Sequence, residues 1–279
     1  MASFLALFSS LLWGAADFFG GNLTKKYKAL AVTGVSQSFG LLFGLIVVLI
    51  TSSWFAPTLS WSNYFLPGVF AGTLGFIGLT AFYAGLATGR MGVVSPISSL
   101  SALIPLTVAF INCEKPSAVQ LAGMAVALTG AFCASGPEIK GGISVRPLFY
   151  ALIAAFGFGT AITFIAQGSK SSAIMTMTTM RFTTFIISLA LFAKFKTMGG
   201  FSKRDIPILI GIGGADFFGN VLLGVATTKG LVSLAVVLGS LFPIVTALLA
   251  FKLLHERLHK LQYLGVVFAV LGVVIISLG

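Results

Sequence analysis

The chain has 279 residues, of which 57% are hydrophobic and only 8% are charged. A soluble globular domain carries about 25% charged residues, so the composition excludes a protein with a largely polar surface and indicates an integral membrane protein. The net charge of +11 comes from basic residues that stand singly or in small groups between apolar runs. This distribution is typical of charges that flank membrane spans, so we expect no nucleic-acid partner.

Ten apolar runs are each long enough to cross the lipid bilayer as a helix, which takes about 20 residues. In chain order they lie near 2–23, 29–51, 65–88, 91–111, 117–135, 147–168, 172–194, 206–228, 231–254 and 260–278. The segments between them are short and leave no room for a soluble domain. We therefore predict an all-α integral membrane protein with ten transmembrane helices.

The pattern E-x5-Q-x2-G-x6-G occurs once in each half of the chain. It comprises Glu114, Gln120, Gly123 and Gly130 in the first half and Glu256, Gln262, Gly265 and Gly272 in the second. We predict two five-helix repeats, residues 1–136 and 147–279. Because five is an odd number, the repeats must be inverted relative to each other, an arrangement common in secondary transporters.

Basic residues are concentrated in the loops after the odd-numbered predicted helices, among them Lys25 and Lys203. The loops on the opposite side hold only Lys115, Lys170 and Lys229. Because loops rich in lysine and arginine stay in the cytoplasm, this bias predicts that both termini lie outside.

Several stretches resemble the drug/metabolite transporter superfamily, EamA type. They are "LLWGAADFFGG", "AFYAGLATGRMGVVSPISSL", "CEKPSAVQLAG" and "HERLHKLQYLG", and the resemblance covers nearly the whole chain. It implies a multi-pass protein of the bacterial inner membrane that transports, and often exports, a small metabolite or drug. It also implies cytoplasmic termini, opposite to the charge bias, so the side of the termini stays open. The predicted fourth helix is about one turn short, since Pro105 lies 9 residues before Glu114 but Pro243 lies 13 before Glu256.

We interpret the chain as a secondary transporter, with export favoured, that works by alternating access. The alternative is an importer or uniporter of a sugar-like or amino-acid solute. The sequence has no G-x-x-x-x-G-K-[ST] nucleotide-binding motif, so transport must follow a solute or ion gradient, and carboxylates in the membrane make protons the expected ion. No cofactor is expected, and the sequence leaves monomer and homodimer equally open.

Residues His255 to His259 spell H-E-x-x-H, the pattern in which two histidines bind zinc and a glutamate acts as base in peptidases. A catalytic zinc usually takes three protein ligands, but no His, Asp or Glu follows His259. The equivalent loop of the first repeat has Cys113 and Glu114 and no histidine. An intramembrane zinc peptidase is therefore a remote alternative, and we expect neither a metal site nor an enzyme.

Ionisable side chains inside membrane helices are costly and each indicates a functional site. The candidates for binding substrate or protons are Asp17, Arg181, Asp216, Asn220, Gln37 and Gln167. Arg181 and Asp216 lie at similar depth near the middle of their predicted helices, so we expect them to pair, either as part of the site or as a structural lock. The three amides are expected to bond in a polar cavity or to hold helices together.

Both aspartates belong to the word "ADFFG", which occurs at 16–20 and 215–219 but out of register with the repeats. The glycines of "GIGGADFFG" predict a flexible stretch beside Asp216. Glu114, Glu256 and Arg257 lie at predicted helix turns, where the glutamates could cap the helix that follows or act in gating.

Overall fold

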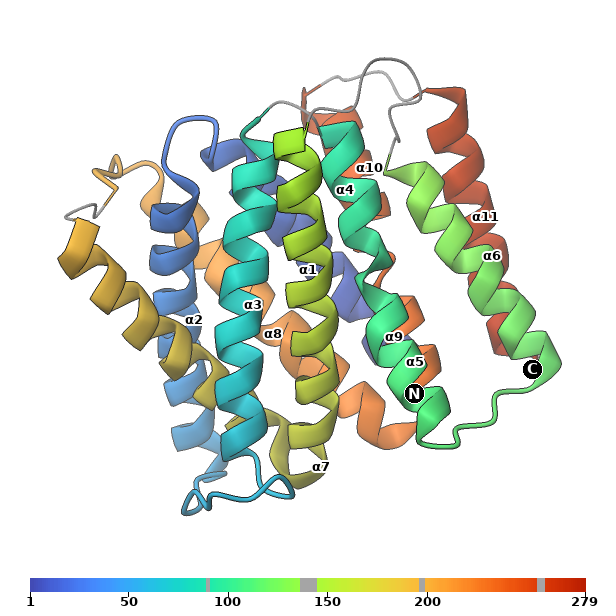
Figure 1. Cartoon of the computed structure of the whole chain (residues 1–279), viewed down its shortest axis with the longest axis horizontal. Helices are drawn as coiled ribbons and strands as arrows, with labels where there is room; N and C mark the ends of the chain where they lie inside the picture. Colours follow the sequence, from blue (N-terminus) through green and yellow to red (C-terminus); the bar gives the residue numbers. More distant parts are fainter. Residues whose placement is uncertain (89–90, 136–144, 196–198, 255–258) are drawn as a thin grey trace.

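The computed structural model describes residues 1–88, 91–135, 145–195, 199–254 and 259–279. These residues form a bundle of long helices that run roughly side by side (Figure 1), with no strand among them. The helices are α1 (Ala2–Leu23), α2 (Ala29–Thr51), α3 (Phe65–Leu86), α4 (Met91–Ser99), the short 3-10 helix η1 (Leu100–Ala102), α5 (Leu103–Ile111), α6 (Ala118–Ala134), α7 (Val145–Phe195), α8 (Ile206–Lys229), α9 (Val232–Gly239), α10 (Phe242–Leu254) and α11 (Lys260–Leu278).

The bundle carries apolar side chains on its outside and polar ones within. Phe4, Leu49 and Phe149 are more than half exposed, whereas Arg181 and Gln37 are among the largest fully buried side chains. Such a surface suits hydrocarbon rather than water. Eight helical stretches in the described residues are long and apolar enough to cross a membrane, and α6, with 17 residues, is shorter.

Two spans that the sequence predicts as continuous are broken in the structure. The first passes from α4 through η1 to α5, and the second turns at Ser240 and Leu241 between α9 and α10. Pro105 and Pro243 lie in the first turn after each break, and a proline has no N–H to donate to the preceding turn. The α-helical hydrogen-bond pattern is thus interrupted at both points, within stretches that are each counted as one span. Helix α5 has 9 residues and α10 has 13, so α5 is shorter by 4 residues. The shorter spacing from Pro105 to Glu114 than from Pro243 to Glu256 predicts this difference.

Helix α7 joins two predicted helices, 147–168 and 172–194. Its 51 residues are helical except at Ser172, where φ is −164° and ψ is 117°. Figure 1 shows the two arms diverging from this turn. The count of eight spans includes α7 only once.

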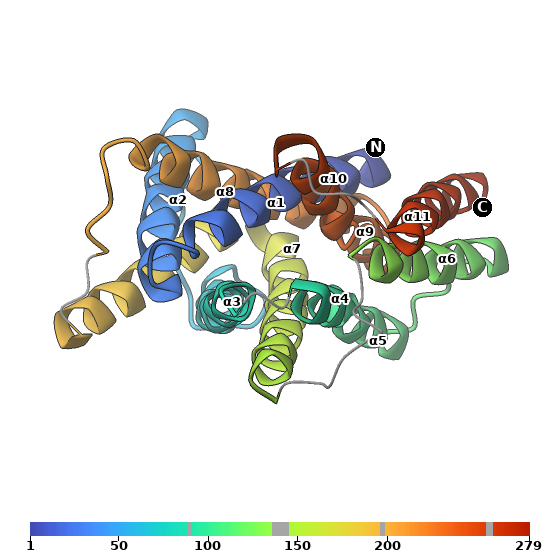
Figure 2. The same ribbon diagram turned by 90° about the horizontal axis from the view of Figure 1, so that it is seen from above.

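Helices α6 and α11 pack closely at one end of the molecule (Figure 2) and account for the glycines of the repeated pattern. A Cβ on Gly130 would lie 2.7 Å from the Cα of Ala269, and one on Gly272 would lie 2.7 Å from the Cα of Ala127. Small residues at such a crossing let two backbones meet within a membrane. The glycines of both repeats therefore serve the same helix contact.

The glutamines of the repeated pattern begin these two helices. Gln120 Oε1 accepts from the backbone N–H of Ser117 at 2.9 Å, and Gln262 Oε1 accepts from that of His259 at 2.9 Å. Each glutamine thus satisfies a backbone donor at a helix start.

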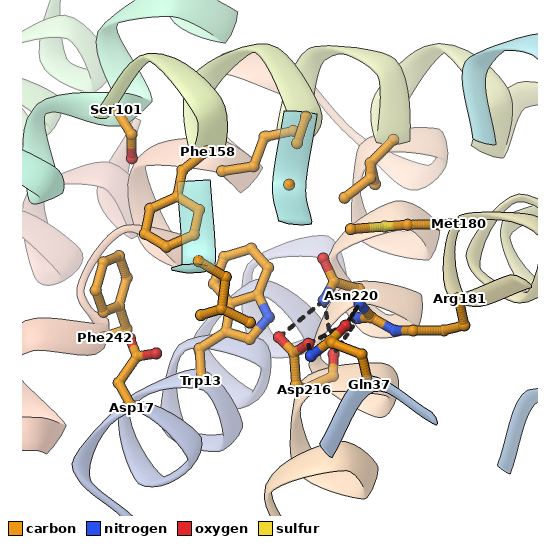
Figure 3. A pocket seen from close by; sticks show the side chains of 15 residues that line it. Trp13, Asp17, Gln37, Ser101, Phe158, Met180, Arg181, Asp216, Asn220 and Phe242 are labelled. Carbon is orange, nitrogen blue, oxygen red and sulfur yellow. Dashed lines mark hydrogen bonds and ion pairs between the residues drawn. The ribbon is translucent and has the colours of Figure 1, made fainter. Parts of the chain in front are cut away.

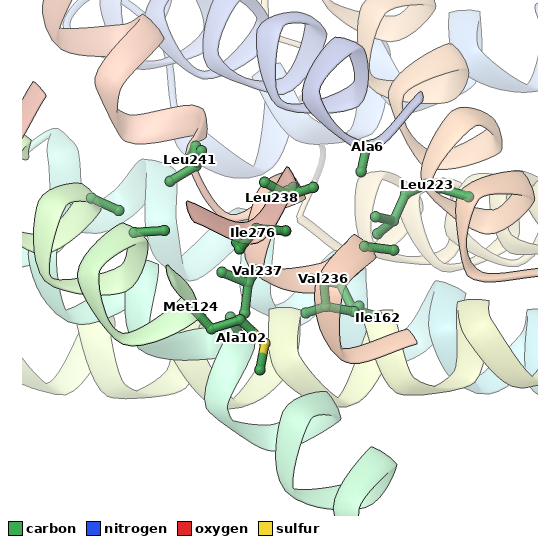
Figure 4. Close-up of a cluster of buried hydrophobic side chains, with 14 of the residues drawn as sticks. Ala6, Ala102, Met124, Ile162, Leu223, Val236, Val237, Leu238, Leu241 and Ile276 are labelled. Atoms are coloured by element: carbon green, nitrogen blue, oxygen red, sulfur yellow. The ribbon is translucent and has the colours of Figure 1, made fainter. Parts of the chain in front are cut away.

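A buried apolar cluster connects α6 and α11 to the rest of the bundle (Figure 4). Met124 of α6 and Ile276 of α11 pack with Val236 to Leu238 of α9, and Ala6 of α1 and Leu223 of α8 extend the cluster. Because lipid is as apolar as these side chains, close packing rather than water exclusion stabilises such contacts. The α6–α11 pair is thus fixed to helices from both halves.

Candidate functional site

A cavity lies inside the bundle. Its polar lining consists of Asp17 of α1, Gln37 of α2, Arg181 of α7, and Asp216 and Asn220 of α8. Gln37, Arg181 and Asp216 come from the middle parts of their spans, and Asp17 lies six residues before the end of α1, so most of the polar lining lies at mid-depth between the two ends of the bundle.

Asp216 is the centre of a hydrogen-bonded cluster in this cavity (Figure 3). Its Oδ2 lies 2.9 Å from Arg181 Nη2 and accepts from Gln37 Nε2 at 2.7 Å. Asn220 Nδ2 donates to Asp216 Oδ1 at 3.2 Å, and Arg181 Nη1 donates to Gln37 Oε1. The expected pair of Arg181 and Asp216 is thus formed, and the two opposite charges neutralise each other in a site where a lone charge is costly.

Glycines bring the helices that carry this cluster into close contact. A Cβ on Gly40 of α2 would lie 3.2 Å from both Arg181 Cδ and the carbonyl oxygen of Gly213. Helix α8 is continuous through its glycine-rich stretch, and the flexibility expected beside Asp216 stays a prediction. The glycines let α2 approach α8 closely enough for Gln37 to reach Asp216.

Asp17 lines the same cavity without belonging to the cluster. It is 8% exposed, and among the described residues it has neither a hydrogen-bond nor an ion-pair partner. The two "ADFFG" words lie on α1 and α8, which pack together, and Ser9 Oγ donates to the carbonyl oxygen of Gly219 at 2.7 Å. The repeated word therefore brings two aspartates to one cavity from neighbouring helices.

Gln167 is not part of this cavity, contrary to expectation. Its Nε2 donates to the backbone carbonyl of Trp61 at 3.2 Å. It lies five residues before Ser172, close to the turn of α7, so its depth in the bundle is too shallow to reach the other candidates. Gln167 fastens the loop before α3.

Three aromatic residues and one serine also line the cavity: Trp13, Phe158, Phe242 and Ser101. The other lining residues are Gly75, Leu79, Ala161, Ile162, Ile165 and Met180. Trp13 lies four residues before Asp17 on the same helix face, a spacing that could have identified it from the sequence. Phe242 and Ser101 come from the two broken spans. No sequence signal marks Ser101, because it reaches the cavity only through the 3-10 turn of η1.

Glu114 caps a helix from the other half of the chain. Its carboxylate accepts from the backbone N–H of Val232 at 2.8 Å and of Ser233 at 3.0 Å, at the start of α9. Cys113, with φ of 63°, makes the left-handed turn that precedes it. Ser117 and Gln120 cap the helix that follows Glu114, so Glu114 caps α9 instead. A carboxylate at a helix N-terminus satisfies free N–H groups and the positive end of the helix dipole.

A second contact between the halves lies at the opposite end of the bundle. The hydroxyl of Tyr27, which follows α1, donates to Asp205 Oδ2 at 2.6 Å and accepts from the backbone N–H of Ser202 at 3.2 Å. The Tyr27 ring packs on Phe201 with centroids 4.5 Å apart. The hydrogen bond to Asp205 raises the pKa of Tyr27 above the ordinary tyrosine value.

The H-E-x-x-H pattern falls largely outside the described residues, as do the predicted turn residues Glu256 and Arg257. His259, the last residue of the pattern, precedes the first turn of α11. Within the described ranges no cluster of His, Cys, Asp and Glu side chains could hold a metal ion.

A bundle of apolar helices around a buried polar cavity defines a multi-pass membrane protein. A model of the EamA-like transporter family matches residues 1–136 and again residues 145–278, so the chain belongs to the EamA-like transporter family. The class of the protein is therefore a membrane transporter of small molecules, and this assignment gives the zinc peptidase no support.

One solved structure has a similar fold. It is a crystal structure whose title names it only as a protein, and its TM-score with this chain is 0.79. The match covers 99% of this chain and 96% of the other, at 16% sequence identity. At that identity the likeness concerns the fold alone. No curated protein matches the chain.

Proposed function

We propose that this chain is a secondary transporter of the inner membrane that moves a small organic metabolite or drug by alternating access. The observation that carries the proposal is the cavity, because both halves of the chain line it. Asp17 and Gln37 come from the first half, and Arg181, Asp216 and Asn220 come from the second. A site at mid-depth between two repeats is where secondary transporters bind their solutes.

The proposal includes ten membrane crossings in two inverted repeats, residues 1–136 and 147–279. A straight helix of 51 residues would be about 75 Å long, far beyond the roughly 30 Å of a bilayer core. The turn at Ser172 supports counting each arm of α7 as a crossing of its own. With α6 as a short crossing, each repeat has five. The pairing of α6 with α11 through equivalent glycines supports this symmetry.

The two contacts between the halves are the proposed gates. Glu114 binds the start of α9 near one membrane face, and Tyr27 binds Asp205 near the other. In alternating access, the halves would part at one contact while the other stays closed. Glu256 and Arg257 remain predicted gating residues by their place in the repeat.

Within the cavity, we assign the Asp216 cluster to holding α2, α7 and α8 in register. Its carboxylate accepts from three side chains, which leaves little capacity for a solute. Asp17 is then the carboxylate with capacity to bind a solute or a coupling proton. Export is the favoured direction, as the resemblance implies, and import of a sugar-like or amino-acid solute is the alternative.

A cysteine in the cavity tests alternating access without knowledge of the solute. Ser101→Cys is made in a chain with Cys113→Ser and Cys133→Ser, which removes both native thiols. We expect membrane-impermeant thiol reagents to modify it both in intact cells and in inverted membrane vesicles. Ala127→Cys, fully buried between α6 and α11, is the matched control and should stay unmodified in both. Modification of Ser101→Cys from one side alone would refute the proposal.

A further inference from the structure

The cavity is lined by two acidic side chains and one basic side chain. Among the described lining residues, Asp17, Arg181 and Asp216 are the ionisable ones. Arg181 and Asp216 form an ion pair at 2.9 Å, so their charges cancel. With Asp17 ionised, the cavity carries a net charge of −1, and a single positive charge would neutralise it.

The surroundings of Asp17 are apolar and aromatic. Trp13 and Phe242 meet edge to face, with ring centroids 6.3 Å apart and an interplanar angle of 86°. Figure 3 shows Asp17 and Phe242 at one end of the cavity and the Arg181–Asp216 cluster toward the other. Aromatic faces attract organic cations, and a buried carboxylate favours a cation because an unpaired buried charge is costly.

One further polar group faces this end of the cavity. The hydroxyl oxygen of Ser101 is buried and has no hydrogen-bond partner among the described residues. A buried hydroxyl normally finds a partner, so a bound ligand could supply one. Ser101 would therefore contact the body of the ligand while Asp17 pairs with its charge.

Other solute classes fit this lining less well. An organic anion would need the guanidinium of Arg181, whose charge is already paired with Asp216. A sugar would need many hydrogen-bond partners, whereas the free polar groups of the lining are few. A monovalent cation with an apolar body satisfies both the charge and the apolar surface.

We propose that the cavity binds a monovalent organic cation with an aromatic or branched apolar body, and that Asp17 is its counter-ion. The proposal rests on the proposed function, in which the cavity is the transport site. It names the substrate class and places recognition at Asp17 rather than at the Arg181–Asp216 pair.

Equilibrium dialysis of the purified full-length protein tests this with three probes of similar size: benzyltrimethylammonium, p-toluenesulfonate and benzyl alcohol. The cation should bind and the anion and the neutral alcohol should bind more weakly. Asp17→Asn should weaken binding of the cation by about tenfold or more, whereas Asp17→Glu should retain it within about twofold. The matched control Glu138→Gln removes an acid from the predicted loop between the repeats and should bind like the parent protein. Thermal unfolding without probe verifies that each variant is folded.

Cation binding that survives unchanged in a folded Asp17→Asn variant would overturn the proposal, as would anion binding equal to that of the cation or no binding of the cation to the parent protein. The thiol test on Ser101→Cys separates this from the proposed function. Access from both sides with no cation binding would reject the substrate class alone. Access from one side with intact cation binding would reject alternating access but leave the Asp17 site.

Discussion

Replacing Arg181 by glutamine removes the only positive charge described in the cavity and leaves Asp216 unpaired. The Arg181 side chain is 2% exposed and that of Asp216 is 16% exposed, so water can replace little of what is lost. Breaking a buried pair from one side costs about 3–5 kcal/mol. Gln37 and Asn220 still donate to the Asp216 carboxylate, so we expect a cost at the lower end of this range. We expect Arg181→Gln to lower the free energy of unfolding by about 3 kcal/mol, or more than a hundredfold in the unfolding equilibrium.

The assay is unfolding of the purified protein in mixed micelles by increasing mole fractions of sodium dodecyl sulfate, followed by circular dichroism. Asp216→Asn should cost at least as much, because it leaves the guanidinium of Arg181 without its counter-charge. The double variant replaces the ion pair by two neutral amides, so its loss should be smaller than the sum of the single losses by about 0.5–3 kcal/mol. Arg146→Gln, at an exposed position, is the matched control and should change stability by less than about 0.5 kcal/mol.

A loss within about 0.5 kcal/mol for Arg181→Gln, or single losses that simply add, would refute the assignment of this pair to helix packing. Transport separates the two roles of Asp216. Full pH-driven transport in the double variant is expected if the pair only positions helices. A folded Asp216→Asn variant that exchanges solute at equal pH but has lost proton-driven accumulation would instead make Asp216 the coupling residue.

Three further outcomes follow from the fold. Gly130→Leu should destabilise the protein by about 1–3 kcal/mol in the same unfolding assay, because the leucine side chain would clash with the backbone of α11. Unchanged stability would contradict the observed α6–α11 contact. His255→Ala and His259→Ala should leave cation binding intact, and mass spectrometry should find no stoichiometric zinc in the parent protein. Stoichiometric zinc in the parent that is lost together with activity in either variant would revive the peptidase. Reporter fusions should place the loops at Lys25 and Lys203 on the same, cytoplasmic, side of the membrane, and opposite sides would break the ten-crossing topology.

Most of the helices could be predicted from the sequence because apolar runs of bilayer length have few alternatives to a helix in lipid. The predicted 29–51 coincides with α2, and the predicted 117–135 differs from α6 by one residue at each end. The breaks around η1 and between α9 and α10 could not be placed, because a proline indicates a disturbed helix without saying whether it bends or ends.

The candidate site could be predicted where the free-energy cost of burying a charge demands a partner. It could not be predicted where tertiary packing selects the hydrogen-bond partner. Buried charges need partners, so the pairing of Arg181 with Asp216 followed from depth alone. The partners of Gln167 and Glu114 could not be predicted because an amide or a surface carboxylate can bond to many backbone groups, and only the tertiary structure selects among them. The left-handed turn at Cys113 directs Glu114 to α9. Because Cys113 is not a glycine, the sequence does not indicate this turn.

Paired distance measurements on the two faces test alternating access most directly. The Glu114 face is the membrane face where Glu114 binds α9, and the Tyr27 face is the one where Tyr27 binds Asp205. One spin-label pair, on native Cys113 and on Lys229→Cys in a chain with Cys133→Ser, reports the Glu114 face. The other pair, on Lys25→Cys and Arg204→Cys in a chain without native thiols, reports the Tyr27 face. Glu114→Ala removes a cap worth about 0.5–2 kcal/mol. The account predicts that this substitution lengthens the distance distribution on the Glu114 face and shortens it on the Tyr27 face. A change confined to the Glu114 face, or lengthening on both faces, would contradict it.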